Sequence, residues 1–283
     1  YGTLTAVRSV IVRDAIAPVI TLVNGDRIPV ELGEPFTDPG ATALDNVDGD
    51  VPVRSSLDFP VNGLIAHWKM DETEGTVIAD VSGNDVNGTI GGGVTLAQDG
   101  RTGKAISMDG VDGHVSLGDV DAMDKPASFT FSTWFNRRSE IATKTNHNVN
   151  NVLIGHSSVA TNDNLEIGSE GSQVEIYLDA GTNVNGQPEV DGIVQAEAGI
   201  QNGTWHHLVL TYDTADAEGK PLKLYVDGAL VQSWDQFKNP LDSSDTSPLS
   251  LGVARSVDEK WGQFDGLQDE TALWNRALSS NEV

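Results

Sequence analysis

The sequence predicts an all-β protein, an antiparallel β-sandwich, and three observations support that prediction. Thirty glycines and eleven prolines punctuate the 283 residues, and no long stretch shows helical periodicity. Apolar and polar residues alternate along residues 205–212 and again along 222–226. Between residue 226 and the next apolar run, Asp227-Gly228 stands where a tight β-hairpin turn would need it. Alternation over consecutive strands indicates a packed antiparallel sheet with at least one buried face.

The stretch from Trp205 to Val231 is the clearest sheet segment. One face of its two strands should be formed by His206, Leu208, Leu210, Tyr212, Leu222, Leu224 and Val226. The adjacent pair His206-His207 could suggest a metal or catalytic site. Neighbouring residues on a strand point to opposite faces, however, so the two imidazoles cannot converge on one ion. We therefore expect both histidines to be framework residues.

Charge limits the choice of partners. The chain carries 42 Asp and Glu against 17 Lys and Arg, a formal net charge of −25. Nucleic acid and anionic membranes are poor partners for such a chain, because phosphate binding needs a basic surface. The acidity suits Ca²⁺, whose ligands are carboxylate, amide and carbonyl oxygens. Simple solubility is the alternative explanation.

Cysteine is absent, so neither disulfides nor thiol chemistry contribute. No apolar run approaches the roughly 20 residues that span a bilayer, and no signal peptide is evident, so membrane insertion is not expected. Residues 1–13 alternate well enough to form a strand, with Leu4, Ala6, Val10 and Val12 on one face. Because the predicted strand begins at residue 1, we expect this sequence to be a segment of a longer precursor.

The sequence from Asp14 to Val53 has a different pattern and resembles the bacterial immunoglobulin-like repeats of large secreted and surface proteins. The resemblance rests on residues 17–22, Glu31, Gly33, residues 37–41 and residues 45–50. Pro18 can begin a strand where a missing N–H is harmless, and Asp38-Pro39-Gly40 supplies a turn. Residues 1–13 resemble the last strand of such a repeat.

The closing strands of that repeat are missing after Asp50, and a different module begins near Gly63. Either residues 1–13 complete the unit, or they belong to a preceding repeat, or the missing strands lie beyond Val283 and the second domain is an insertion. We predict a partial immunoglobulin-like β module over residues 1–60 and a second domain over residues 61–283.

The second domain resembles the laminin-G-like domains of the concanavalin A-like type. The resemblance rests on seven runs that occur in the family's order: residues 64–90, 103–118, 128–139, 203–213, 222–231, 249–254 and 264–283. It implies a jelly-roll sandwich of two antiparallel sheets whose first and last strands are neighbours. The residues agree independently, because Phe129, Phe131, Thr133 and Phe135 alternate with polar positions and Trp134. Only the end reads as helical, as a short turn in which Glu282 follows Ser279 by three residues, as in a capping box.

The same resemblance implies a structural Ca²⁺ site. Its ligands would be side-chain oxygens of Asp80, Asn84 and Asp269 and the carbonyl of Gly88. The alternative is an Asx-turn in which Asp80 and Asn84 bond their own backbone. A second acidic group, Asp45, Asp48 and Asp50, could bind Ca²⁺ at a module junction, although its spacing is not that of an EF-hand and a solvated turn is the default.

Catalysis is not expected. Glycoside hydrolases of this fold place two carboxylates about 5 Å apart through a Glu-x-Asp-x-x-Glu run, and no such run occurs. Asp269 and Glu270 are adjacent on a strand and should face opposite sides. A G-x-S-x-G elbow is also missing. The sequence therefore favours a module without enzymatic activity.

For binding, aromatic side chains outside the core matter most, because sugar rings stack on them. Trp234 and Trp261 are flanked by polar residues in the sequence and are the candidate sugar contacts. The alternative is that each of them covers a sheet edge. The loop 136–151 concentrates basic and amide residues, and its Arg137, Arg138 and Lys144 could recognise a sulfate or carboxylate on a glycan. A solvated loop is the default there. Residues 171–201 could form one wall of a groove.

We therefore predict a carbohydrate-binding or adhesion module without catalytic activity, from a secreted or surface bacterial multidomain protein. Its partners would be a polysaccharide or cell-surface glycan and the neighbouring modules of the same polypeptide. The extracellular location follows from the module type. The alternative is a structural spacer or protein–protein adhesion module without a glycan site, stiffened by Ca²⁺.

Overall fold

The computed structural model describes residues 19–23, 41–45, 49–51, 59–141, 149–158, 162–180, 191–242, 248–254 and 261–283. The chain divides into two compact units, Tyr1–Phe59 and Pro60–Val283. Each unit is described by itself.

The first unit contains a small antiparallel sheet of three strands, in the order β1 (Val19–Leu22), β2 (Ala41–Asp45) and β3 (Gly49–Val51). β1 begins directly after Pro18, as expected. In the register, Leu44 of β2 lies opposite both Val19 and Asp50. The predicted strand 1–13, the turn at 38–40 and Asp48 lie outside the described residues. The immunoglobulin-like character of this unit stays a prediction.

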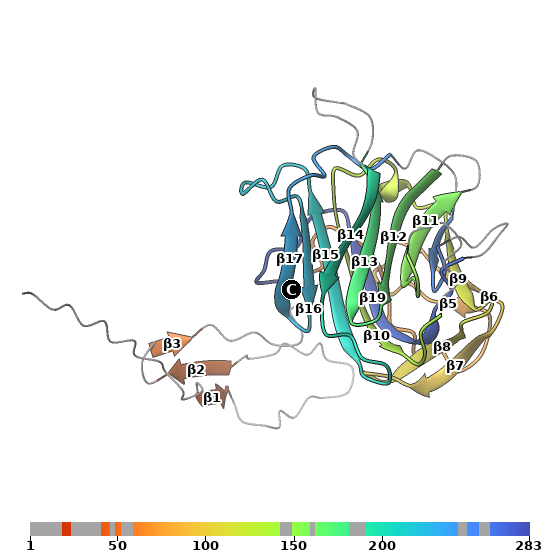
Figure 1. Cartoon of the computed structure of the whole chain (residues 1–283). Coiled ribbons are helices and arrows are strands. Elements are labelled where there is room, and N and C mark those ends of the chain that lie inside the picture. The colour runs from red at the N-terminus through yellow and green to blue at the C-terminus, as the bar shows by residue number, and fades with distance from the viewer. Residues whose placement is uncertain are drawn as a thin grey trace, which may run out of the picture. The chain divides into compact units, whose positions relative to one another are not determined.

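The second unit is a sandwich of two antiparallel sheets (Figure 1). The first sheet has the order β17 (Ala229–Trp234), β16 (Leu222–Val226), β15 (His206–Asp213), β10 (Ser128–Arg137), β19 (Asp265–Trp274), β8 (Lys104–Asp109) and β7 (Val94–Asp99), and β4 (Leu64–Trp68) also pairs with β19. The second sheet has the order β14 (Asp191–Glu197), β13 (Gln173–Asp179), β12 (Asn162–Glu170), β11 (Ile154–Ser158), β18 (Leu249–Leu251), β9 (His114–Gly118), β6 (Gly88–Gly91) and β5 (Val77–Ile78). A single 3-10 turn, η1 (Asp121–Met123), is the one helical element among the described residues.

This arrangement confirms the all-β prediction and agrees with a jelly-roll sandwich. The first strand of the unit, β4, pairs antiparallel with the last, β19, as the resemblance implied. Within the described parts of the chain, no helix has the length and apolar character needed to cross a membrane.

The core lies between the two sheets and follows the predicted alternation. Phe129, Phe131, Thr133 and Phe135 of β10 are all fully buried. Their neighbours on β15 and β16 are buried as well, at His206, Leu208, Leu210, Tyr212, Leu222, Leu224 and Val226. The sheet faces that point away from this core are called the outer faces below.

The hairpin between β16 and β17 turns at Asp227-Gly228, as predicted. Both residues have positive φ angles, 52° and 79°, which a two-residue hairpin turn of this kind requires. Asp227 also anchors the histidine pair, because its Oδ1 accepts the backbone N–H of His207 at 2.9 Å and its Oδ2 lies 2.9 Å from Nδ1 of His206. His206 lies on the core side, whereas His207 stacks on Trp134 with ring centroids 4.9 Å apart. The two imidazoles therefore face opposite sides, as expected.

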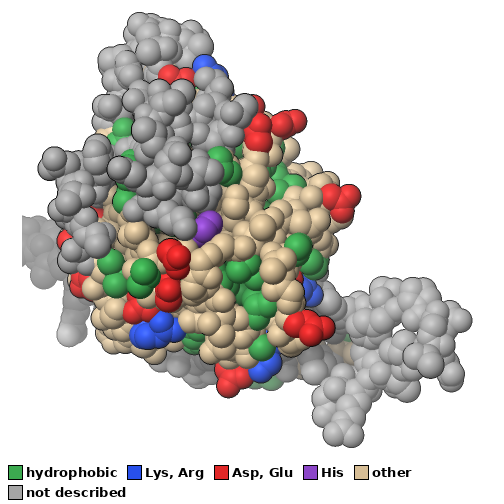
Figure 2. Space-filling model, turned by 90° about the vertical axis from the view of Figure 1, so that its right-hand side faces the viewer, with side chains coloured by type: hydrophobic (Ala, Val, Ile, Leu, Met, Phe, Trp, Pro, Cys, Tyr) green, Lys and Arg blue, Asp and Glu red, His purple; other side chains and the backbone are tan. Residues whose placement is uncertain are grey.

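Figure 2 shows one face of the molecule. Asp and Glu side chains are scattered over the described part of this face among backbone and neutral polar groups, and Lys and Arg form no large patch on it.

Candidate functional site

The first predicted site, the turn around Asp80, is closed by hydrogen bonds. Oδ1 of Asp80 accepts the backbone N–H groups of His67 at 2.9 Å and Ser82 at 2.8 Å. Oδ2 accepts the Ser82 hydroxyl at 2.7 Å and the Val86 N–H at 3.1 Å. Burial raises the pKa of Asp80, but these four hydrogen bonds outweigh it and leave the pKa below its usual value.

Asn84 belongs to the same turn. Its side-chain Nδ2 donates to the carbonyls of Leu64 at 2.9 Å and Ile65 at 3.0 Å. Gly88 begins β6, where it pairs with Ile78, and a side chain there would collide with Val115. Asp80 thus forms an Asx-turn with Ser82, whereas Asn84 does not bond its own backbone and instead ties the turn to the start of β4.

Asp269 lies on β19 and is fully buried. Its Oδ2 accepts the N–H of Thr102 at 2.9 Å, from the loop between β7 and β8. Burial, with a smaller contribution from the neighbouring Glu270, raises the pKa of Asp269 to about 6. Glu270 itself has a positive φ of 46°, and its Oε2 lies 2.6 Å from Nε2 of His67.

The oxygens of these residues do not form a Ca²⁺ ligand set in the arrangement that the structure shows. Both oxygens of Asp80 already accept N–H or O–H donors, and a bound cation would have to displace them. Among the described residues, no group of three or more His, Asp or Glu side chains is placed to hold a metal ion. Ca²⁺ binding stays a prediction of the sequence, and the hydrogen bonds favour the Asx-turn interpretation of Asp80. Of the second acidic group, Asp45 ends β2 and Asp50 lies in β3.

The prediction that Trp234 lies outside the core is wrong. Its side chain is 9% exposed and belongs to the core cluster. The reason is the register of the hairpin, because Trp234 pairs with Leu222, and directly paired residues share a face. The polar neighbours of Trp234 in the sequence face solvent instead.

The prediction that Arg137 lies in a loop is also wrong. Arg137 is the last residue of β10 and is 2% exposed. It continues the alternation that buries Phe135, so its guanidinium points inward and donates to Asn202 at 2.6 Å, Ser169 at 3.0 Å and the Gly171 carbonyl at 2.6 Å. Burial lowers the pKa of this guanidinium. Its donors therefore serve the fold.

Arg138 remains half-exposed but is engaged. Its guanidinium donates to Asp265 and to the Ser107 hydroxyl, the latter at 2.6 Å. Lys144 lies outside the described residues.

Trp261, the other predicted aromatic contact, packs on the outer face of the second sheet. It is half-buried against Val149, Val152 and Ala254, together with Tyr177 of β13. Its indole Nε1 donates to Oε1 of Glu166 at 3.0 Å. We call this region, defined by Trp261, Tyr177, Val149, Val152, Ala254, Glu166 and Glu175, the Trp261 face.

Two buried carboxylates underlie the Trp261 face. Glu166 on β12 and Glu175 on β13 alternate with core residues and are both fully buried. Oε1 of Glu175 accepts the amide of Gln195 at 2.5 Å, and Oε2 accepts the backbone N–H of Asn150 at 3.2 Å. These carboxylates tie loop segments to the sheet. They were not predicted, although polar residues alternating with core positions on both strands were the available signal.

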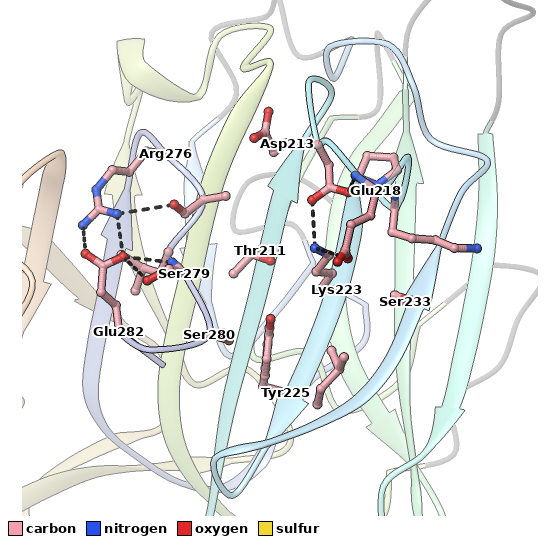
Figure 3. Close-up of a pocket in the computed structure, with 16 residues that line it drawn as sticks. Thr211, Asp213, Glu218, Lys223, Tyr225, Ser233, Arg276, Ser279, Ser280 and Glu282 are labelled. Carbon is pink, nitrogen blue, oxygen red and sulfur yellow. Dashed lines mark hydrogen bonds and ion pairs between the residues drawn. The ribbon is translucent and has the colours of Figure 1, made fainter. Parts of the chain in front are cut away.

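A groove opens on the outer face of the first sheet, over β15, β16 and β17 (Figure 3). Its volume is about 490 Å³, and the turn at residues 276–282 forms one wall. Hydroxyl groups line it from several segments, at Thr211, Tyr225, Ser233, Ser279 and Ser280. Thr211 and Tyr225 are buried in its floor.

The charged side chains of the groove are arranged in ion pairs. Lys223 Nζ donates to Asp216 at 2.8 Å and to Glu218 at 3.3 Å. Arg276 forms a two-point pair with Glu282, at 2.9 Å and 2.6 Å (Figure 3). This hydrogen bond to Arg276 is the main cause that lowers the pKa of Glu282 to about 2.

The turn that carries Glu282 contains one of the two bonds of the predicted capping box, because the Glu282 carboxylate accepts the Ser279 N–H, whereas the Glu282 N–H donates to the Ser279 carbonyl. The Ser279 N–H and hydroxyl donate to the Glu282 carboxylate at 2.9 Å and 2.8 Å. The turn lies against β10, because Thr130 Oγ1 accepts the Leu278 N–H at 2.9 Å. The groove itself was not predicted from the sequence, since its lining comes from two separate segments of the chain, residues 211–233 and 276–282.

A laminin G family model, described as the concanavalin A-like lectin/glucanases superfamily, matches residues 109–283. No curated protein matches the sequence significantly. Among solved structures, domain 4 of AbnA, a GH43 extracellular arabinanase from Geobacillus stearothermophilus in complex with arabinotriose, is similar with a TM-score of 0.52 and 22% identity. That match covers 77% of this chain and 95% of that domain.

Two further similar structures are much longer than the matched region. The binding domain of Paraclostridial Mosquitocidal Protein 1 has a TM-score of 0.57 at 17% identity, over 78% of this chain and 51% of that one. A mutant Trypanosoma rangeli sialidase displaying trans-sialidase activity has a TM-score of 0.54 at 18% identity, over 79% of this chain and 32% of that one. At these identities the likeness concerns the fold.

Proposed function

The chain belongs to the concanavalin A-like lectin/glucanases superfamily, and from this premise we propose that its sandwich is a noncatalytic module that binds carbohydrate. The observation that carries the proposal is the groove over β15–β17. Its volume of about 490 Å³ lies within the range of small-ligand sites. Its lining combines hydroxyl groups with ionised donors and acceptors, which are the partners that sugar hydroxyls need.

The groove is also preorganised. Ion pairs and backbone hydrogen bonds hold its charged side chains, as in Asp216, whose Oδ1 accepts the N–H groups of Glu218 at 3.0 Å and Lys220 at 2.9 Å. Side chains that are already fixed lose little conformational entropy when a ligand binds. A low entropy cost supports the binding of a sugar chain, whose individual contacts with a protein are weak.

The acid–base properties of the groove support a noncatalytic role. Glycoside hydrolysis needs one carboxyl group that is protonated near neutral pH and a second that is ionised. Hydrogen bonds from Arg276 and Ser279 keep the pKa of Glu282 at about 2. The pKa of Asp216 is also lowered, because the hydrogen bonds from Lys223 and two backbone N–H groups outweigh the effect of burial. Neither group suits the role of proton donor.

The similar arabinanase domain, solved with arabinotriose, supports the idea that this fold accommodates oligosaccharide. That arabinanase is extracellular. We extend the proposal to a secreted or surface protein in which residues 1–60 act as an immunoglobulin-like spacer and the sandwich contacts a polysaccharide or cell-surface glycan.

A glycan array with the full chain tests the proposal, using Ser280→Trp to fill the groove. Ser280 is exposed and lines the groove, so the substitution should leave the fold intact and weaken binding at least about tenfold, or 1.4 kcal/mol. Ser172→Trp, at an exposed serine on the turn after β12, is the matched control. Absence of any glycan signal would favour a spacer or protein adhesion role instead.

The predicted Ca²⁺ site is tested by repeating the array in EDTA and in CaCl₂ and by measuring the melting temperature of the protein in the same two buffers. If Ca²⁺ bound at Asp80, Asn84, Gly88 and Asp269, chelation would lower the melting temperature. Equal melting temperatures and equal glycan signals in the two buffers would support the metal-free Asx-turn.

A further inference from the structure

The charges of the groove nearly cancel. Its lining contains four carboxylates, Asp213, Asp216, Glu218 and Glu282, against three cationic side chains, Lys220, Lys223 and Arg276. Four negative and three positive charges leave a formal charge of −1.

The three cations are each engaged by a carboxylate. Lys223 binds Asp216 and Glu218, Arg276 binds Glu282, and Lys220 Nζ lies 3.2 Å from Asp235 Oδ2. Arg276 is further committed, because its Nε donates to the Asn62 carbonyl at 2.7 Å. A sulfate or carboxylate on a ligand would have to compete with these internal partners and would meet a net negative surface.

Uncharged hydroxyl groups meet no such obstacle. The Lys223 ammonium has three N–H donors, and the two carboxylates that it binds leave one for a ligand oxygen. Asp213 uses Oδ1 to accept the Ala215 N–H at 2.9 Å and can accept a ligand hydroxyl at its other oxygen. Hydrogen bonds with one ionised partner are about twice as strong as neutral ones.

We propose that the groove selects uncharged glycans and discriminates against sulfated or uronic acid polymers. This inference rests on the proposed carbohydrate-binding function and names the ligand class of the same site. It differs from the anionic glycan that the sequence suggested through Arg137, Arg138 and Lys144.

The test is affinity electrophoresis and calorimetry of the full chain with two sets of polysaccharides. The uncharged set contains arabinan, xylan, mannan and mixed-linkage β-glucan, and the anionic set contains polygalacturonate and chondroitin sulfate. We expect binding to at least one uncharged polymer, with an affinity that changes less than about twofold between 50 and 500 mM NaCl, because no ion pair with the ligand is screened. Ser280→Trp should abolish it.

Three outcomes decide between the two proposals. Binding of an anionic polymer with no binding of an uncharged one would overturn the selectivity and leave the carbohydrate-binding function standing. No binding to either set would overturn both. Binding to an uncharged polymer that Ser280→Trp leaves unchanged would keep the function and remove the groove as its site.

A charge variant tests the cause of the selectivity. Asp216→Asn with Glu218→Gln frees Lys223 and changes the groove from −1 to +1, while the amide introduced at position 216 retains an oxygen for the two backbone N–H groups. We expect chondroitin sulfate binding at least about tenfold stronger than that of the wild type in 50 mM NaCl. Asp99→Asn with Glu74→Gln makes the same change in net charge at residues that do not line the groove and frees Lys104 from Asp99. An equal gain in that control would show that net charge, not the groove, excludes the anion.

Discussion

The two outer faces of the sandwich use charged side chains in opposite ways. On the Trp261 face, the carboxylates of Glu166 and Glu175 are fully buried and hold loop segments onto the second sheet. In the groove on the other sheet, Lys223 and Arg276 pair with carboxylates within reach of solvent. One face uses polar groups to build the fold, and the other keeps them at a surface where a ligand can reach them.

This difference shows why residue type alone does not identify a binding site. Trp261 and Arg137 are residue types that often contact glycans, yet the N–H groups of both donate hydrogen bonds within the protein, to Glu166 and to the Gly171 carbonyl. The groove offers no fully exposed aromatic residue, but its hydroxyls and ion pairs are fixed and reachable. Four substitutions can break or sharpen this contrast.

The largest effect is expected at Arg137, which anchors the turn beside the second sheet. Arg137→Ala should lower the free energy of unfolding by about 3 to 5 kcal/mol, because three hydrogen bonds from a charged donor are lost and the buried Ser169 hydroxyl is left without that donor. Urea denaturation measures the loss. A loss below about 1 kcal/mol would mean that Arg137 is free for a ligand after all.

A pH-dependent effect is expected at Asp269, which shares the outer face of the first sheet with the groove but is covered by the loop at Thr102. Its folded pKa of about 6 exceeds the unfolded value, so the native state holds the extra proton between about pH 4 and 6. Stability from this group therefore falls as pH rises through that window. Asp269→Asn should gain about 2 kcal/mol relative to the wild type between pH 4 and pH 7.

Denaturation midpoints of Asp269→Asn and the wild type at both pH values provide the check. A constant difference between the two proteins would show that the pKa of Asp269 is the same in the folded and unfolded states.

Trp261→Ala separates the two faces most directly. It should cost about 2 kcal/mol of stability, because a half-buried indole and its bond to Glu166 are lost. Glycan binding should be unchanged, since the groove lies on the other sheet. Loss of binding with an unchanged melting temperature would transfer the site to the Trp261 face.

The smallest effect is expected at Glu282. Glu282→Gln should change stability at pH 7 by less than about 1 kcal/mol, because the pair with Arg276 is partly exposed. The folded pKa of about 2 lies below the unfolded value, so this contribution exists above about pH 4.5 and disappears as pH falls toward 2. Thermal melts of both proteins at pH 3 and pH 7 should therefore differ more at pH 7.

Local alternation was enough to predict much of the fold. The hairpin at Asp227-Gly228, the buried face of Phe129 to Phe135 and the opposite orientation of His206 and His207 all follow from a period of two and one turn signal. The pairing of β4 with β19 came from family resemblance, because no local pattern reports contacts 200 residues apart.

The candidate site was less predictable for physical reasons. Polar neighbours made Trp234 and Arg137 look exposed, but strand register decides which face a side chain occupies. The groove depends on the placement of residues 276–282 beside β15 and β16, and only the capping box at Ser279 and Glu282 gave a local sign of that turn.

The register of the Asp227-Gly228 hairpin decides which side chains of β17 reach the groove. Trp234 is in the core because it lies opposite Leu222, whereas its neighbour Ser233 lines the groove. Since strand side chains alternate, inserting one codon between Gly228 and Ser233 would exchange the two faces of β17. Trp234 would then move from the core to the groove and give it an aromatic platform, at the cost of a core contact. The same side chains would then give the groove an aromatic surface, and the core would lose the contacts of Trp234.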